Sequence, residues 1–132
     1  MDEALIVAGV GCRRGASAAA IRAAIDAALA RARLGSDVLG AIAIPEKKRQ
    51  EPGVVAAARA LRVPLVLVSQ RELEAAGHRA VTRSARVMAL MGVPSVAEAA
   101  ALAAGGANAR LLAPRIAIGP ATCAIAETGD RP

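Results

Sequence analysis

Short apolar runs alternate with helix-like patterns along the first half of this chain, and this alternation restricts the fold more than any other feature. The apolar runs cover residues 5–10, 38–44 and 63–68, and each fits one buried β-strand. After the first run, apolar residues recur at helical spacing, at Ile21, Ile25, Ala28, Leu29 and Ala32. Strands that alternate with helices form parallel or mostly parallel sheets covered by helices. The sequence therefore predicts an α/β domain.

Cap and turn signals predict where several elements begin and end. The spacing Ser-x-x-Glu occurs at Ser69 and again at Ser95, and it predicts a capping box at the start of two helices. Gly35 is expected to close the helix that follows Ser17. The run at residues 63–68 is continuously apolar, which predicts a strand covered on both faces.

The second half of the chain is less regular. Residues 82–91 are compatible with a helix, which residues 92–94 would break. Residues 110–113 and 122–126 predict a closing pair of strands around a hairpin at residues 119–120. We expect one domain over residues 1–132, with a flexible tail at residues 128–132.

Composition sets limits on the core and on the partners. The chain has 132 residues, of which 55% are hydrophobic, yet it has no Phe, Tyr or Trp, so Ala, Val, Leu and Ile must form the core. The missing aromatic rings also remove the usual means of stacking on single-stranded bases. The first residues are acidic and the apolar run after them is short, unlike a signal peptide or a spanning helix. We therefore expect a cytoplasmic protein with no membrane partner.

The charge balance is basic. Lys and Arg number 17 against 11 Asp and Glu, which gives a net charge of +6. Such an excess has two interpretations, a solvated and compositionally biased surface or an anionic ligand. An RNA-binding domain is a further alternative, but the chain has no aromatic residues and no basic helix face, so nucleic acid is not the expected partner.

A turn rich in glycine and arginine joins the first strand to the first helix. Backbone N–H groups at a helix N-terminus favour an anion, and guanidinium groups suit carboxylates or phosphates. The turn matches neither a dinucleotide fingerprint nor a phosphate-binding P-loop, so it is either a general anion site or a plain turn with solvated arginines. The candidate ligand-binding residues here are Gly11, Cys12, Arg13, Arg14 and Gly15.

Cys12 has some features of a nucleophile, because a helix N-terminus and neighbouring arginines would lower the pKa of its thiol. No histidine lies nearby in the sequence to act as a base, so a catalytic cysteine is not the favoured interpretation. The other cysteine is Cys123 and the single histidine is His78. This set predicts neither a disulfide framework nor a metal site.

Other candidate residues follow the later elements. Lys48 lies after the second strand, at the carboxyl end where open α/β sheets bind ligands, although a solvated charged loop explains it as well. A capping box alone would explain Ser95 and Glu98. Arg115 is either a ligand-binding cation or an exposed residue in a strand connection.

Taken in order, four segments resemble the CobE and CbiG C-terminal domain family of cobalamin-biosynthesis proteins. The resemblance rests on residues 10–15, on Lys48 with residues 51–53, on residues 92–102, and on residues 111–115 with 124–126. It covers nearly the whole chain, although Arg115 stands where lysine is common and Pro45 is an addition. The resemblance implies a three-layer α/β/α sandwich with a mostly parallel or mixed sheet of about five strands.

The resemblance also implies a ligand, a polycarboxylate precorrin or corrin intermediate. Separately, we expect no cofactor and no metal of the protein's own. The turn at residues 11–15, Lys48, Ser95 and Arg115 would surround one cleft and hold its carboxylates, while Glu51 or Glu98 would orient the cations or act as acid or base. Longer family members resemble a hydrolase that opens a lactone on the corrin precursor and releases acetaldehyde. A binding protein or carrier that meets other pathway enzymes and a lactone hydrolase therefore both stay open.

Overall fold

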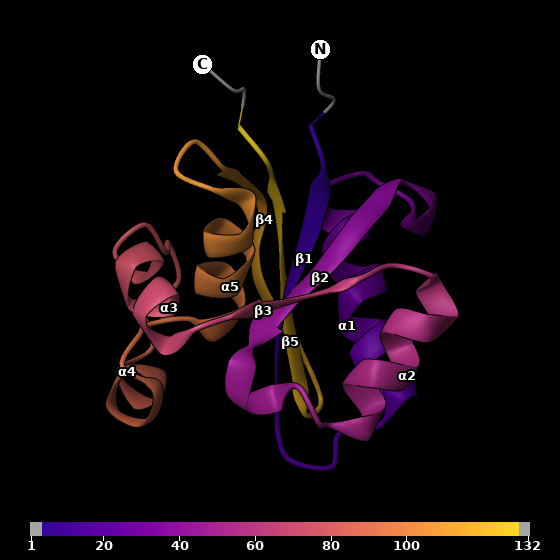
Figure 1. Cartoon of the computed structure of the whole chain (residues 1–132), viewed down its shortest axis with the longest axis horizontal. Coiled ribbons are helices and arrows are strands. Elements are labelled where there is room, and N and C mark those ends of the chain that lie inside the picture. Colours follow the sequence, from indigo (N-terminus) through magenta and orange to yellow (C-terminus); the bar gives the residue numbers. More distant parts are fainter. Residues whose placement is uncertain (1–3, 130–132) are drawn as a thin grey trace.

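A five-stranded mixed sheet runs through the centre of the molecule in the order β3-β2-β1-β5-β4 (Figure 1). The structure is a computed structural model that describes residues 4–129. β1, β2 and β3 are parallel, whereas β5 is antiparallel to both β1 and β4. The strands are β1 (Ile6–Cys12), β2 (Leu39–Pro45), β3 (Leu65–Val68), β4 (Arg110–Ile118) and β5 (Ala121–Glu127). The predicted α/β class and mixed sheet are confirmed.

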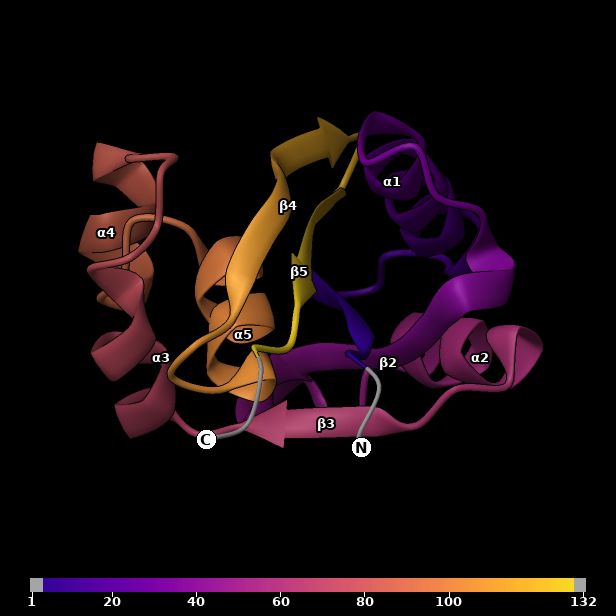
Figure 2. The same cartoon turned by 90° about the horizontal axis from the view of Figure 1, so that it is seen from above.

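Helices cover both faces of the sheet, which confirms the three layers (Figure 2). One face carries α1 (Ala18–Arg31) and α2 (Pro52–Leu61), and the other carries α3 (Gln70–Gly77), α4 (Ala85–Met91) and α5 (Val96–Gly105). Short 3-10 turns, η1 (Ser36–Val38) and η2 (Glu46–Lys48), flank β2. Each face therefore has its own apolar core, one against α1 and α2 and one against α3 and α5.

The first helix follows the predicted pattern. Ser17 caps its N-terminus by accepting a hydrogen bond from the Ala20 N–H at 3.0 Å. Four of the five residues of the predicted apolar face are buried, namely Ile21, Ile25, Ala28 and Leu29. The helix ends at Arg31, before the predicted stop at Gly35, because Arg33 takes the left-handed conformation with φ 61°.

The alanine-rich helix α5 lies very close to β1. A Cβ atom on Gly9 would meet the Ala97 carbonyl oxygen and would lie 2.6 Å from the Ala101 backbone nitrogen. Ala97 and Ala101 are themselves fully buried. Small side chains on both elements therefore bring the helix backbone onto the strand, and the core is filled without aromatic rings.

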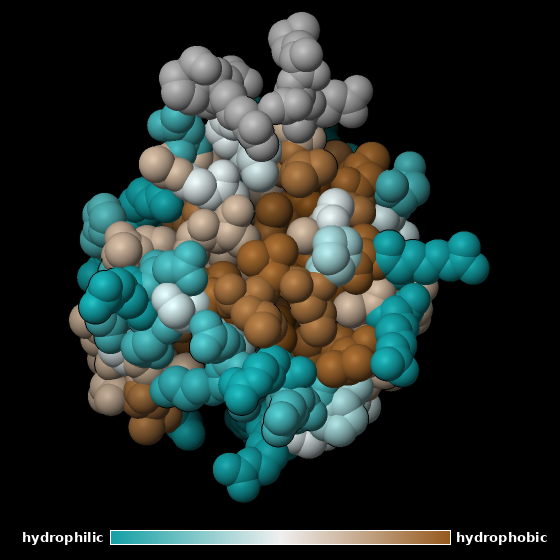
Figure 3. Space-filling model, in the orientation of Figure 1, coloured by the Kyte–Doolittle hydropathy of each residue, from teal (hydrophilic) through white to brown (hydrophobic). Residues whose placement is uncertain are grey.

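Two strands differ from the prediction. β3 is at the edge of the sheet and Leu67 is 42% exposed, so the expected burial of both faces was wrong. Figure 3 shows apolar surface over this edge. β4 is longer than predicted, with an irregular register between Ala113 and Ile116, and the predicted hairpin turn at residues 119–120 is confirmed. A local apolar pattern does not encode which strand becomes an edge.

Two hydrogen bonds join the first and last parts of the described chain. The Leu5 N–H donates to Thr128 Oγ1 at 2.8 Å, and the Thr128 N–H donates to the Leu5 carbonyl at 3.0 Å. The expected tail at 128–132 thus begins with a paired residue, and residues 130–132 lie outside the described residues. No single helix within residues 4–129 is long and apolar enough to cross a membrane; α4 and α5 reach that length only as a pair bent by 65°.

Candidate functional site

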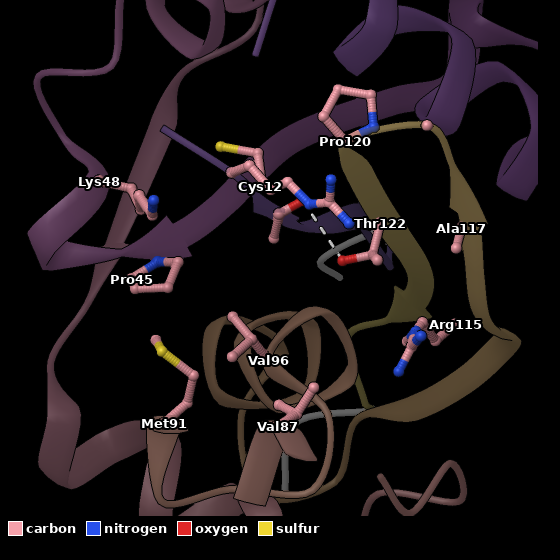
Figure 4. Close-up of a pocket in the computed structure, with 13 residues that line it drawn as sticks. Cys12, Pro45, Lys48, Val87, Met91, Val96, Arg115, Ala117, Pro120 and Thr122 are labelled. Atoms are coloured by element: carbon pink, nitrogen blue, oxygen red, sulfur yellow. Dashed lines mark hydrogen bonds between the residues drawn. The ribbon is translucent and has the colours of Figure 1, made fainter. Parts of the chain in front are cut away.

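A cavity of about 270 Å³ opens at the carboxyl ends of β1 and β2, beside the start of α5 and the β4–β5 hairpin (Figure 4). Its polar lining residues are Cys12, Arg13, Lys48, Arg115 and Thr122. Its larger apolar lining residues are Pro45, Val87, Met91, Val96 and Pro120. Open α/β sheets bind ligands at this end of the strands, where neighbouring connections diverge.

The polar wall is cationic. Arg13, Lys48 and Arg115 come from three separate segments, and no carboxylate is found among the described residues that line the cavity. Lys48 and Arg115 are half-buried, whereas Arg13 is exposed. Three positive charges beside an apolar wall favour a ligand that carries several anionic groups on an apolar body.

The predicted convergence on one cleft is seen for part of the candidate set. Gly11, Cys12, Arg13, Lys48 and Arg115 all line the cavity. Arg14, Gly15 and Ser95 are not among its lining residues. At the start of α5 the lining residue is Val96, whereas its neighbour Ser95 is fully buried with its hydroxyl capping the helix.

The glycine-rich turn binds groups of its own chain. The Arg13 N–H donates to the Pro120 carbonyl at 2.9 Å, and the Gly15 N–H donates to Glu51 Oε1 at 2.9 Å. Gly15 takes a left-handed conformation with φ 78°, which suits glycine. The carboxylate at this turn is therefore the chain's own Glu51, which fastens the start of α2 to the turn.

Cys12 is not activated in the way the sequence predicts. Burial raises the pKa of its thiol, and the carboxylate of Glu51 raises it further, whereas the ammonium group of Lys48 acts in the opposite direction. The expectation that arginines and a helix N-terminus lower this pKa was wrong, because desolvation is the largest effect. The Cys12 thiol is therefore protonated at neutral pH, and burial raises the pKa of the Cys123 thiol as well.

The second Ser-x-x-Glu motif does not form the predicted capping box. Ser95 Oγ accepts a hydrogen bond from the Glu98 N–H at 3.3 Å, so Ser95 is the expected N-cap. The Glu98 carboxylate instead accepts hydrogen bonds from the N–H groups of Val81, Thr82 and Arg115. The correction has a physical reason, since these donors come from segments that pack over the start of α5 and would otherwise be unpaired.

The sequence did not predict the apolar lining from α4 or the hydroxyl of Thr122. Val87 and Met91 of α4 point toward the cavity from one helix face, and their i, i+4 spacing was the available signal (Figure 4). Thr122 Oγ1 donates to the Gly11 carbonyl at 3.3 Å. A Cβ on Gly11 would lie 2.7 Å from Thr122 Oγ1, so a larger residue there would displace the Thr122 side chain and its hydrogen bond.

Fold and site together define a small three-layer α/β/α domain with a cationic, half-apolar cavity at the carboxyl end of its central strand. The family model described as "Cobalamin synthesis G C-terminus" matches residues 6–126. Protein CobE of a Sinorhizobium species is 35% identical over 121 residues, which are 92% of this chain and 79% of that protein. The chain belongs to this family and is a cobalamin-biosynthesis protein similar to CobE and CbiG.

Solved structures agree with this assignment. The crystal structure of CobE, a protein from the cobalamin biosynthetic pathway, matches with a TM-score of 0.87 and 34% identity, over 97% of this chain and 94% of that one. Cobalamin biosynthesis protein chiG of Agrobacterium tumefaciens matches with a TM-score of 0.74 and 41% identity, over 96% and 100%. A putative cobalamin biosynthesis protein G homolog of Sulfolobus solfataricus has a TM-score of 0.74 and 29% identity, over 96% of this chain and 38% of that longer one. The predicted family resemblance is confirmed.

Proposed function

We propose that the cavity binds a polycarboxylate tetrapyrrole intermediate of cobalamin biosynthesis. The observation that carries the proposal is that Arg13, Lys48 and Arg115 line one cavity together with apolar side chains of α4 and α5. Precorrins and corrins have the same two components, a flat apolar ring and peripheral acetate and propionate groups. Lys and Arg would pair with the carboxylates, and the apolar wall would contact the ring.

The size of the cavity favours binding of the ring by its edge. Cavities that enclose drug-sized ligands measure roughly 300–1,000 Å³, and this one measures about 270 Å³. A tetrapyrrole macrocycle is larger than such a ligand, so one edge with its carboxylates would enter while the rest stays outside. This mode suits a protein that receives an intermediate and passes it on.

The surroundings of the two candidate bases favour binding over lactone hydrolysis. Glu98 is fully buried with its carboxylate bonded to backbone N–H groups, and Glu51 is bonded to the turn at Gly15. Neither lines the cavity, and the Cys12 thiol is protonated. A general base must reach the water that it activates, so none of these groups is placed for that step without rearrangement.

Calorimetric titration with cobyrinic acid, a polycarboxylate corrin, and with its methyl ester tests the proposal. The ester keeps the ring but removes the negative charges, so we expect it to bind at least about tenfold more weakly than the acid. Equal affinity for acid and ester would contradict a carboxylate site. Catalytic release of acetaldehyde from a lactone-bearing precursor would overturn the carrier interpretation, and tight, steeply salt-dependent binding of arbitrary RNA would favour the nucleic-acid alternative.

A further inference from the structure

Glu98 is a fully buried carboxylate that joins two separate segments of the chain. Its Oε1 accepts hydrogen bonds from the N–H groups of Val81 at 2.7 Å and Thr82 at 2.9 Å. Its Oε2 accepts a hydrogen bond from the Arg115 N–H at 2.8 Å. Both oxygens are thus occupied, and each oxygen holds a different segment.

Each of these segments leads to residues that line the cavity. Arg115 lies in the irregular part of β4 and supplies a cation. Val81 and Thr82 lead into α4, which supplies Val87 and Met91. One cation of the cavity lining and two apolar residues of α4 are therefore connected through the same side chain.

The position of α4 depends on its ends more than on its own packing. The helix has no fully buried residue, and Leu90 on it is 70% exposed. The Ser84 N–H donates to the Pro94 carbonyl at 3.1 Å, which closes the base of the loop that carries α4. The Gln70 side chain holds the other end of the helix through the Met91 carbonyl at 2.9 Å. The bonds of Glu98 to residues 81–82 fix the chain just before this loop.

The other Ser-x-x-Glu motif shows that capping does not require this arrangement. At α3, Ser69 Oγ accepts from the Glu72 N–H at 3.1 Å and Glu72 Oε1 accepts from the Ser69 N–H at 2.9 Å, so the box closes within four residues. Glu72 remains exposed, whereas Glu98 is fully buried. Burial of a carboxylate is costly unless its oxygens are hydrogen-bonded. The long-range bonds of Glu98 therefore allow its burial and connect residues 81–82 to Arg115.

We propose that Glu98 is a positioning residue for the ligand site, which sets the spacing between the Arg115 cation and the apolar wall of α4. The proposal rests on the proposed function, because it assigns to that binding site the residue that connects Arg115 with the segment before α4. It also predicts coupling, since a ligand that bridges the walls restrains both segments bonded to Glu98. Val81 and Thr82 would respond to the ligand although neither lines the cavity.

Hydrogen exchange of the unaltered protein tests this coupling. On addition of cobyrinic acid, we expect the Val81 and Thr82 amides to exchange at least about tenfold more slowly. The Ser69 and Glu72 amides, held in the local box of α3, serve as the internal control and should not change. Binding of cobyrinic acid with no change at Val81 and Thr82 would overturn the positioning role and leave the proposed function standing. Absence of any binding would overturn both.

A pair of matched variants tests the same role through affinity. In Glu98→Gln the side chain keeps one acceptor oxygen, so it cannot serve both segments, and affinity for cobyrinic acid should fall at least about tenfold. Glu72→Gln removes the same charge from the equivalent position of α3 and should leave affinity within about twofold. The effects of Glu98→Gln and Arg115→Ala should be less than additive, because both act on one cation. Fully additive effects would overturn the proposal. If Glu98→Gln does not fold, the hydrogen-exchange measurement on the unaltered protein decides the question instead.

Discussion

Replacing Lys48 and Arg115 together with alanine is expected to weaken the binding of cobyrinic acid about a hundredfold. Each cation would form a charge-assisted hydrogen bond to a carboxylate, and such a bond contributes about 1.5 kcal/mol at the lower end of its range. The lower end applies because both side chains are only half-buried. Two such losses correspond to about 3 kcal/mol, or roughly two powers of ten in Kd.

The same double variant should fold normally, since half-exposed charges contribute little to stability. Lys47→Ala with Arg71→Ala is the matched control, because it removes the same charge from two exposed positions that do not line the cavity. Calorimetry on both variants separates a local contact from a general effect of net charge. Equal weakening by the two double variants would contradict a site at Lys48 and Arg115.

Gly9→Ala should destabilise the protein by about 3 kcal/mol or more, the upper part of the range for overpacked cores. The added methyl group would meet backbone atoms of α5 at Ala97 and Ala101, and backbone cannot swing aside as a flexible side chain can. The helix would have to move away from β1. Because α5 also carries Val96, which lines the cavity, and Glu98, this shift would disturb the site as well as the core.

Gly40→Ala in the neighbouring strand β2 is the control for that result. A Cβ there would lie 3.3 Å from both the Ile6 carbonyl oxygen and a methyl carbon of Leu5, a tight but accommodable distance. We expect a change within about 1 kcal/mol for this variant. Denaturant unfolding measures both free energies, and similar values for the two variants would show that α5 does not need its close approach to β1.

Local periodicity was enough to predict most of the fold. The apolar face of α1 could be recognised because its buried residues recur at the helical period, and β1 and β2 because a short, continuously apolar run fits a buried strand. The edge position of β3 and the length of β4 could not, because both depend on which strands pair across the sheet. The early end of α1 likewise reflects a left-handed Arg33, a conformation uncommon outside glycine.

The site was predicted in part for a similar reason. Lys48 and the turn at Cys12 occur at element boundaries, Arg115 lies within β4, and the order of these segments along the chain carries the family resemblance. The roles of the two glutamates depend on partners distant in the sequence. Glu51 reaches Gly15, 36 positions away, and Glu98 reaches Arg115 and Val81, each 17 positions away. The two Ser-x-x-Glu motifs have identical spacing, so only the tertiary structure distinguishes the closed box of α3 from the long-range bonds of Glu98.

A crystal structure of the protein with cobyrinic acid would test the central claim most directly, that this cavity receives the edge of a carboxylate-bearing corrin. The account predicts one edge of the ring against Val87 and Met91, with carboxylate oxygens within hydrogen-bond distance of Lys48 and Arg115. A corrin bound elsewhere on the molecule, or one in this cavity with its carboxylates turned away from both cations, would contradict it.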